Sequence, residues 1–297
     1  MKKDLVGFIG LGAMGKCLVP HLLKAGHQVF VCDVSNDAVA AMVMLGAARC
    51  ETPRQVADNA EVVLICVPTP DIVEQVVLGE AGVCEGSRVA VLVDHSTTGP
   101  TIARHIADEL NAHNIAALDA PLAGGVSGAK AGTLSVMVGG DKKAYERCES
   151  IFQSFGKTVV HVGSAPGLGQ VLKLTNNMIV GATLIATCEA VLFGIKSGLN
   201  PQQLLEIVNA STARSFTSEI IVGKAILERT FDFGFRMDLM RKDLRLFLSE
   251  SEAVGAPTFT SSVVKQFFDQ AIAAGLGNED MSTVVCVLES LADTQIK

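Results

Sequence analysis

The sequence predicts an α/β domain with a doubly wound parallel sheet, followed by an all-α helical domain. Three observations predict this fold. Over the first half of the chain, short apolar strand-like runs alternate with helix-like runs, which is the pattern of βαβ units. A glycine-rich turn follows the first apolar run and opens the first helix. After Gly163 the strand pattern stops and only helical periodicity remains.

Each predicted strand is a short run rich in valine, isoleucine and leucine that is bounded by turn residues. Such runs occupy residues 5–9, 28–32, 62–67, 89–93 and 115–118. Helical patterns connect them at residues 14–25, about 36–45, about 71–78 and 100–111. Two more strands, at 132–140 and 157–163, flank a helix from about residue 141 to 155.

The C-terminal part begins with a proline-free, largely apolar helix from about residue 168 to 197. Glycine and proline clusters then predict breaks near residues 198–201, 254–257 and 275–277, and a further break is predicted at about 229–235. We therefore expect two domains, a dinucleotide-binding domain at residues 1–164 and a helical substrate and oligomerisation domain at residues 165–297.

Composition limits the possible partners of the chain. Of 297 residues, 49% are hydrophobic and 19% are charged, and the formal net charge is −7, so neither disorder nor binding to nucleic acid or to an anionic membrane is expected. No secretory leader is evident, and Lys173, Asn176 and Asn177 interrupt the longest apolar run, so we expect a cytoplasmic protein with no membrane span. The eight cysteines form no CxxC pair, and no metal site is expected.

The stretch GFIGLGAMG carries the GxGxxG spacing between a predicted strand and a predicted helix. In that context the glycines allow a pyrophosphate to approach the backbone and the helix N-terminus, as in Rossmann-type domains. Asp33 ends the next strand, where a carboxylate accepts hydrogen bonds from the adenine ribose, and no arginine directly follows it. The sequence therefore predicts NAD, with NADP less favoured, bound through Gly10, Leu11, Gly12, Ala13, Met14, Gly15 and Asp33.

A lysine and two asparagines interrupt the apolar helix in the stretch GQVLKLTNNM. A buried charge costs several kcal/mol unless it is paired or neutralised, and Lys173 and Asn177 share one helix face because they are four residues apart. Burial also lowers a lysine pKa toward working pH, which suits proton transfer. We predict that Lys173 is a general acid and base; the plainer interpretation is a lysine whose head group reaches water.

Other polar or glycine-rich stretches follow predicted strands at residues 66–70, 94–100 and 119–134. Because open α/β sheets bind ligands beyond the carboxyl ends of their strands, these stretches are expected to surround one crevice. Gly124 and Gly125 there present bare backbone amides that suit a carboxylate. Each stretch taken alone is equally typical of an ordinary strand-ending turn.

Four stretches in order, GFIGLGAMG, DAPLAGGVSGAKAGTLSVMVGG, GQVLKLTNN and KDLRLFLSE, resemble the β-hydroxyacid dehydrogenase family over nearly the whole chain. The resemblance implies that Lys173 is the catalytic lysine and that Asn177 contacts substrate. It also implies that Thr97 and Lys242 line the nicotinamide site, that Val67 and Pro68 border the cofactor, and that residues 122–125, including Ala123, Gly124 and Gly125, grip the substrate carboxylate. From the residues alone, Lys242 equally suits the charged face of a solvated helix, and Asp243 is expected to pair or cap locally.

This chain departs from the family pattern at two positions. Ala123 stands where many members have serine, and His95 stands where small or apolar residues are usual. Arg214 lies in a stretch, STARSF, that resembles part of some dicarboxylate-acting members; it is a candidate for substrate selectivity or simply an exposed structural arginine.

The resemblance implies an NAD-dependent oxidoreductase that acts on a small 3-hydroxy acid or its semialdehyde or oxo acid, of the 3-hydroxyisobutyrate, tartronate semialdehyde or 2-hydroxymethylglutarate type. A homodimer or homotetramer is expected because an apolar helical domain exposed to water would be a liability. Two alternatives stay open: a catalytically silent NAD-binding scaffold, and an imine reductase of related architecture. Both would be expected to lack the lysine that stands at position 173.

Overall fold

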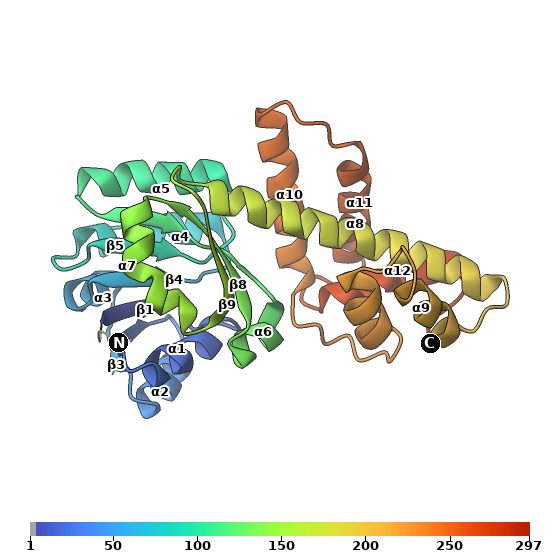
Figure 1. Ribbon diagram of the computed structural model, residues 1–297, viewed down its shortest axis with the longest axis horizontal. Coiled ribbons are helices and arrows are strands. Elements are labelled where there is room, and N and C mark those ends of the chain that lie inside the picture. Colours follow the sequence, from blue (N-terminus) through green and yellow to red (C-terminus); the bar gives the residue numbers. More distant parts are fainter. Residues whose placement is uncertain (1–3) are drawn as a thin grey trace. The chain divides into compact units, whose positions relative to one another are not determined.

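The computed structural model describes residues 4–297, which divide into two compact units, the first ending at Lys173 and the second running from Leu174 to Lys297. Helix α8 (Leu168–Lys196) continues from the first unit into the second. The domain boundary that we expect between residues 164 and 165 stays a prediction. The predicted fold class is confirmed, since a largely parallel sheet with helices is followed by a helical unit (Figure 1).

The described residues of the first unit form a nine-stranded sheet in the order β3-β2-β1-β4-β5-β6-β8-β7, with β9 paired to β8. The first six strands run parallel. Their bounds are β1 Leu5–Ile9, β2 Gln28–Cys32, β3 Ala48–Arg49, β4 Val62–Ile65, β5 Val91–Asp94 and β6 Ala116–Asp119. The strand order reverses between β1 and β4, which makes the carboxyl ends of these two strands the topological switch point.

Helices cover both faces of this sheet, which explains why its strands are continuous apolar runs. One face packs α1 (Gly15–Lys24), α2 (Asn36–Met44) and α7 (Lys142–Gln153) against Phe8, Val31 and Leu64. The other face packs α3 (Pro53–Asn59), α4 (Pro70–Leu78) and α5 (Pro100–Ala112) against Ile65 and Leu92. The apolar side chains of the strands are therefore buried between two layers of helices.

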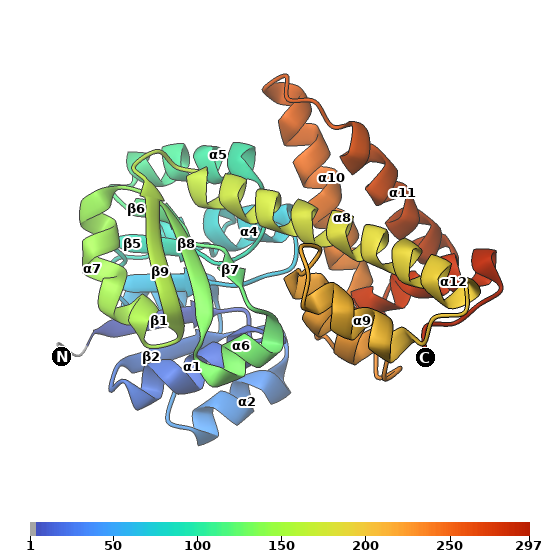
Figure 2. The ribbon, with the colours of Figure 1, turned by 45° about the vertical axis from the view of Figure 1, so that its right-hand side comes forward.

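Several elements of the first unit were not expected from the sequence. The sheet contains antiparallel pairs, because β8 (Leu134–Gly140) runs against β6 and against the two-residue strand β7 (Leu122–Ala123), while β9 (Gly156–Gly163) is parallel to β8. The short elements β3, α3, a 3₁₀ turn at Val83–Glu85 and α6 (Gly125–Ala131) were also missed. Figure 2 shows β7, β8 and β9 together with α6. Elements of two to seven residues offer too few turns for a periodic signal.

The described part of the second unit is helical after α8. It contains α9 (Pro201–Asn209), a π-helix (Thr217–Ile226), α10 (Met237–Ala253), α11 (Phe259–Ala273), a 3₁₀ turn (Met281–Val284) and α12 (Val285–Ala292). Its core includes Leu184 and Cys188 of α8, Leu244 of α10 and Phe268 of α11. The buried Glu289 fastens the C-terminal end by accepting hydrogen bonds from Ile296 N at 2.8 Å and from Arg229 Nη1 at 2.5 Å.

By length and apolar composition alone, α8 could cross a membrane. The core helix of a water-soluble domain passes the same test, and 44% of the most apolar window of α8 is buried in this structure. Its exposed apolar side chains include Ile179 and Phe193. The expectation that no segment of the chain spans a membrane therefore stays a prediction.

Candidate functional site

The glycine-rich loop lies at the switch point of the sheet. Gly10 follows β1 with φ of +97°, and a Cβ placed there would lie 2.3 Å from the carbonyl oxygen of Cys66 at the end of β4. At Gly15 a Cβ would lie 2.0 Å from the carbonyl oxygen of Gly10, so α1 packs directly on the loop. By contrast, a Cβ at Gly12 would meet nothing within 4 Å. The loop is therefore closed toward the sheet and open at Gly12, which fits the approach of a pyrophosphate.

Asp33 lies beside this loop. Its Oδ2 accepts a hydrogen bond from Leu11 N at 2.5 Å, and its Oδ1 accepts one from Ser35 N at 2.7 Å. Each carboxylate oxygen can accept a further hydrogen bond. The geometry brings a negative charge next to the glycine loop, as the spacing predicts.

A cation that sequence reasoning missed lies close to the same strand end. Arg49, at the end of β3, donates from Nη2 to Asn36 Oδ1 at 2.8 Å and from Nε to Glu51 Oε1 at 2.6 Å. Asn36 is only three residues from Asp33, so a guanidinium stands near the end of β2 although no arginine directly follows Asp33 in the sequence. The parallel pairing of β2 with the two-residue strand β3 places it there, and so short a strand carries no periodic signal in the sequence.

The loops after β4 and β5 are tied to each other. Val67 N donates to Ser96 Oγ at 2.9 Å, and Ser96 N donates to Asp94 Oδ1 at 2.8 Å. Ser96 is buried, Val67 and Thr97 are half-buried, and Pro68 is exposed. Val67, Pro68 and Thr97, three of the four residues predicted to line or border the cofactor site, therefore lie on two neighbouring loops at the carboxyl edge of the sheet, one and two strands away from the glycine loop.

The predicted carboxylate-binding segment is a tight turn between β7 and α6. Gly124 is exposed with φ of +128°, Gly125 has φ of +65°, and Ala123 is half-buried at the end of β7. The helix that follows is held by α1, because His21 Nε2 donates to the carbonyl oxygens of Ala129 at 3.0 Å and Lys130 at 3.2 Å. Figure 2 shows α1 and α6 close together. The predicted carboxylate-binding segment at residues 122–125 is thus connected through α6 to α1, the helix that follows the glycine loop, within the first unit.

Replacing Gly124 with valine should abolish substrate use. A β-branched side chain is strained at φ of +128°, and its Cβ would lie 3.0 Å from Leu134 Cδ2. The matched control is Gly46→Val, which places the same side chain at a positive φ of +106° where nothing lies within 4 Å. We expect kcat/KM for the acid substrate to collapse in Gly124→Val and to persist in the control; unchanged kcat/KM in both would move carboxylate binding elsewhere.

Asp119, at the end of β6, anchors the start of α8. It is 5% exposed, and its two carboxylate oxygens accept from Gly167 N at 2.7 Å and from Gln170 N at 2.8 Å. Burial raises the pKa of Asp119 to about 6, and the backbone hydrogen bonds oppose that rise. The carboxyl group therefore binds its proton more tightly in the folded chain than the ordinary value of 3.8 implies for the unfolded one.

This pKa predicts a pH-dependent stability term. Because the folded pKa is the higher one, the contribution is complete below the unfolded pKa and is lost as pH rises through about 6. At about 1.4 kcal/mol per unit, its size is on the order of 3 kcal/mol. The contribution of His95 to the free energy of unfolding changes in the opposite direction with pH. Burial lowers the pKa of His95 to about 4, so its contribution is lost as pH falls.

The measurement is therefore the free energy of unfolding of the wild type minus that of Asp119→Asn, obtained from urea denaturation at several pH values between about 3 and 7. We expect the advantage of the wild type over Asp119→Asn to shrink as pH rises from below 4 to above 6. Parallel curves would contradict the assignment.

In the second unit, Asp243 of α10 joins two of the predicted site residues. Asn177 Nδ2 donates to Asp243 Oδ2 at 2.6 Å, and Lys242 Nζ lies 3.0 Å from Asp243 Oδ1. Asp243 is 2% exposed and Asn177 is 5% exposed. The local pairing expected of Asp243 is present, but its hydrogen bond to Asn177 was not expected from the sequence. Asn176 Nδ2 donates in turn to Asn177 Oδ1 at 3.1 Å, which fixes the orientation of that amide.

His95, one of the two departures from the family pattern, and Arg214, the selectivity candidate, have different surroundings. His95 is buried, donates from Nδ1 to Ala120 O at 2.7 Å and lies edge-on to the rings of Phe152 and Phe155, so it is a neutral core side chain. Arg214 is exposed and donates from Nε to Glu219 Oε1 at 2.7 Å. Its role in selectivity stays a prediction.

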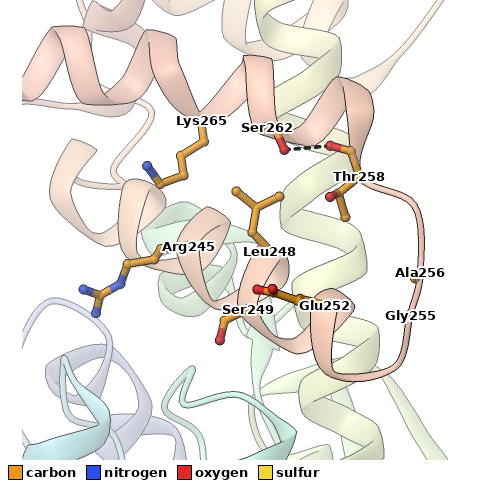
Figure 3. Close-up of a pocket in the computed structure, with 9 residues that line it drawn as sticks. All are labelled: Arg245, Leu248, Ser249, Glu252, Gly255, Ala256, Thr258, Ser262 and Lys265. Carbon is orange, nitrogen blue, oxygen red and sulfur yellow. Dashed lines mark hydrogen bonds between the residues drawn. The ribbon is translucent and has the colours of Figure 1, made fainter.

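A cavity of about 640 Å³ opens between α10 and α11 (Figure 3). It is lined by charges of both signs, Arg245, Lys265 and Glu252, and Ser262 Oγ beside it donates to Thr258 O at 2.9 Å. It contains none of the predicted site residues. Among residues 4–297, no group of three or more His, Cys, Asp or Glu residues is placed to hold a metal ion.

Comparison with known proteins identifies the family. Residues 5–163 match the family model described as the NAD binding domain of 6-phosphogluconate dehydrogenase, and residues 167–288 match that described as NAD-binding of NADP-dependent 3-hydroxyisobutyrate dehydrogenase.

Individual relatives agree over the whole chain. The chain is 37% identical to 2-(hydroxymethyl)glutarate dehydrogenase of Eubacterium barkeri, covering 100% of this chain and 99% of the relative. It is 35% identical to 2-hydroxy-3-oxopropionate reductase of Escherichia coli, covering 98% and 99%. The structure of Mycobacterium tuberculosis 3-hydroxyisobutyrate dehydrogenase with L-serine superposes with a TM-score of 0.88 at 29% identity, covering 97% and 99%. The chain therefore belongs to the β-hydroxyacid dehydrogenase family of NAD(P)-dependent oxidoreductases.

Proposed function

We propose that this enzyme transfers a hydride between the nicotinamide of NAD and a small 3-hydroxy acid or its semialdehyde or oxo acid, with Lys173 as the general acid and base. One observation carries the proposal. Within the first unit, the turn of α8 that bears Lys173 begins at the same carboxyl edge of the sheet as the glycine loop, because Asp119 and Gln170 fasten that turn to the ends of β5 and β6.

The nicotinamide, when bound, takes up or delivers the hydride. The protein must then move the proton on the substrate oxygen. In oxidation, neutral Lys173 accepts the hydroxyl proton; in reduction, its ammonium group polarises the carbonyl oxygen and returns the proton. Asn177, held by Asp243, orients the substrate oxygen or carboxylate. The Gly124 and Gly125 amides hold the carboxylate without a side chain, and Ala123 contributes no hydroxyl to it.

The open loop at Gly12 and the carboxylate of Asp33 support NAD as the cofactor, bound through Gly10, Leu11, Gly12, Ala13, Met14 and Gly15. Val67, Pro68, Thr97 and Lys242 complete the proposed nicotinamide surroundings. We further propose a cytoplasmic homodimer or homotetramer. The exposure of large apolar side chains such as Phe193 of α8 and Phe259 of α11 supports association.

The substrate class is tested with NAD and four acids: 2-(hydroxymethyl)glutarate, 3-hydroxyisobutyrate, L-serine and glycerate. The names of the relatives motivate this choice, and each acid carries a carboxylate and a hydroxyl group that a hydride acceptor can oxidise. We expect the formation of NADH with at least one of them. A cyclic imine offered with NADPH is the counter-test. Turnover of the imine with none of the four acids would favour the imine reductase alternative, and binding of NADH with no turnover of either kind would favour a scaffold.

A further inference from the structure

Gln170 is an amide side chain with no exposed surface, in the first turn of the helix that carries Lys173. Its Oε1 accepts hydrogen bonds from Thr98 N at 3.0 Å and from Gly99 N at 3.2 Å, and its Nε2 donates to Ser96 O at 2.9 Å. Its own backbone N donates to Asp119. The side chain thus makes three hydrogen bonds to a single loop, the one that follows β5.

Burying an amide costs free energy that an apolar side chain would not, so these hydrogen bonds offset a penalty. A helix that needed only to pack on the sheet could use leucine at this position. A glutamine instead sets the position of the turn along the loop, because acceptor and donor must both meet their partners at once. These hydrogen bonds therefore fix the position of the first turn of α8 relative to the loop after β5.

The loop that Gln170 grips is the one that carries Thr97. Through Ser96, whose Oγ accepts from Val67 N, it is also connected to the loop after β4. On the other side, Lys173 follows Gln170 by three residues, about 4.5 Å along a helix axis. One side chain therefore links the turn that bears the lysine to both loops proposed to border the nicotinamide.

We propose that Gln170 is a positioning residue, which holds Lys173 in register with the Ser96–Gly99 loop while Asp119 anchors the same turn. This inference rests on the proposed role of Lys173. It predicts that the loss of Gln170 misplaces the proton-transfer group relative to the cofactor loops without removing any group that binds NAD.

Gln170→Met is the first test, because methionine has similar length and bulk but can replace none of the three hydrogen bonds. We expect kcat with the best of the four acids to fall about 10- to 100-fold, since small misplacements of reacting groups have effects of this order. The Kd of NADH, from its fluorescence, should change by less than about threefold. Unchanged kcat would overturn the proposal.

Gln170→Glu supplies a conditional rescue. In this variant, a protonated carboxyl group would accept from Thr98 N and Gly99 N and donate to Ser96 O, as the amide does, whereas the ionised form would face that carbonyl oxygen as a repulsive charge. Burial and the neighbouring carboxylates of Asp94 and Asp119 favour the protonated form, and the nearby His95 is neutral. The activity of this variant relative to wild type should rise as pH falls. A flat ratio across pH, like that of Gln170→Met, would contradict the proposal.

Hydrogen exchange separates this inference from the proposed function. In the enzyme without substrate, the amides of Thr98 and Gly99 should lose protection in Gln170→Met and keep it in Lys173→Met. If Lys173→Met retained turnover, the acid–base assignment would fail. If Gln170→Met retained both protection and turnover, the positioning role alone would fail.

Discussion

Lys173→Met should lower kcat by about 100- to 10,000-fold or more, because general acid–base steps contribute effects of this size. Methionine keeps the length and apolar stem of lysine but has no proton to exchange. The glycine loop and Asp33 are separate from this position, so the Kd of NADH should stay within about threefold of wild type. The measurement is steady-state turnover with the best of the four acids, combined with NADH fluorescence.

A matched control exists on the same helix. Lys196, in the last turn of α8, is exposed and donates to Ala292 O at 2.7 Å, so Lys196→Met removes a charge from α8 without touching the proposed site. That variant should retain turnover. If Lys173→Met kept a tenth of wild-type kcat, another group would have to carry the proton.

Local pattern was sufficient for the large elements of the fold. The bounds of β1 and β2 match the expected runs 5–9 and 28–32, because each is a short, mostly buried apolar run that is followed directly by a glycine or a polar residue, Gly10 after β1 and Asp33 after β2. The glycine loop and Asp33 were also predictable from the sequence, since each directly follows a predicted strand. The antiparallel strand β8 was expected as a strand but its direction was not, because strand direction depends on how a connection returns to the sheet.

Contacts between residues that are distant in sequence could not be predicted from local sequence patterns. Asn177 and Asp243 are 66 residues apart, and Asp119 and Gln170 are 51 apart. In each case the sequence displayed a polar residue in an apolar setting, which indicates that a partner exists but not which one. Arg49 and Asn36 are only 13 residues apart, yet their contact depends on a two-residue strand that carries no periodic signal.

These distant partners share one property: they make hydrogen bonds or ion pairs with buried or half-buried polar groups around α8 and the sheet edge. Asp119 accepts from backbone amides at the start of α8, and Gln170 accepts from amides of a neighbouring loop. Asp243 accepts from Asn177 and pairs with Lys242. A functional helix that is apolar elsewhere thus needs dedicated acceptors for each polar group that it buries. The two buried polar side chains of α8, Gln170 and Asn177, both lie in its N-terminal half.

The second large effect expected is a preference for NAD over NADP of roughly 30- to 1000-fold in kcat/KM. The 2′-phosphate of NADP would meet the Asp33 carboxylate as a like charge and would lose the hydrogen bonds that ribose hydroxyls can make to it. Together these effects cost about 2–4 kcal/mol, at 1.4 kcal/mol for each factor of ten. Arg49 does not offset this cost in the wild type, because its guanidinium is already engaged by Glu51 and Asn36.

The ion pair between Arg49 and Glu51 makes the prediction divisible into two steps. Asp33→Ser removes the repulsion and should narrow the preference, since serine can still accept from Leu11 N. Adding Glu51→Gln releases Arg49 from its carboxylate partner near the same strand end, so the double variant should use NADP better than Asp33→Ser alone, whereas Glu51→Gln by itself should change little while Asp33 remains. The measurement is kcat/KM for each cofactor in the four proteins at saturating substrate, with raised salt as a check, because the contribution of an exposed arginine to phosphate binding is screened. Equal use of NAD and NADP by the wild type would show that Asp33 does not select the cofactor, and a double variant no better with NADP than Asp33→Ser would show that Arg49 cannot reach the phosphate.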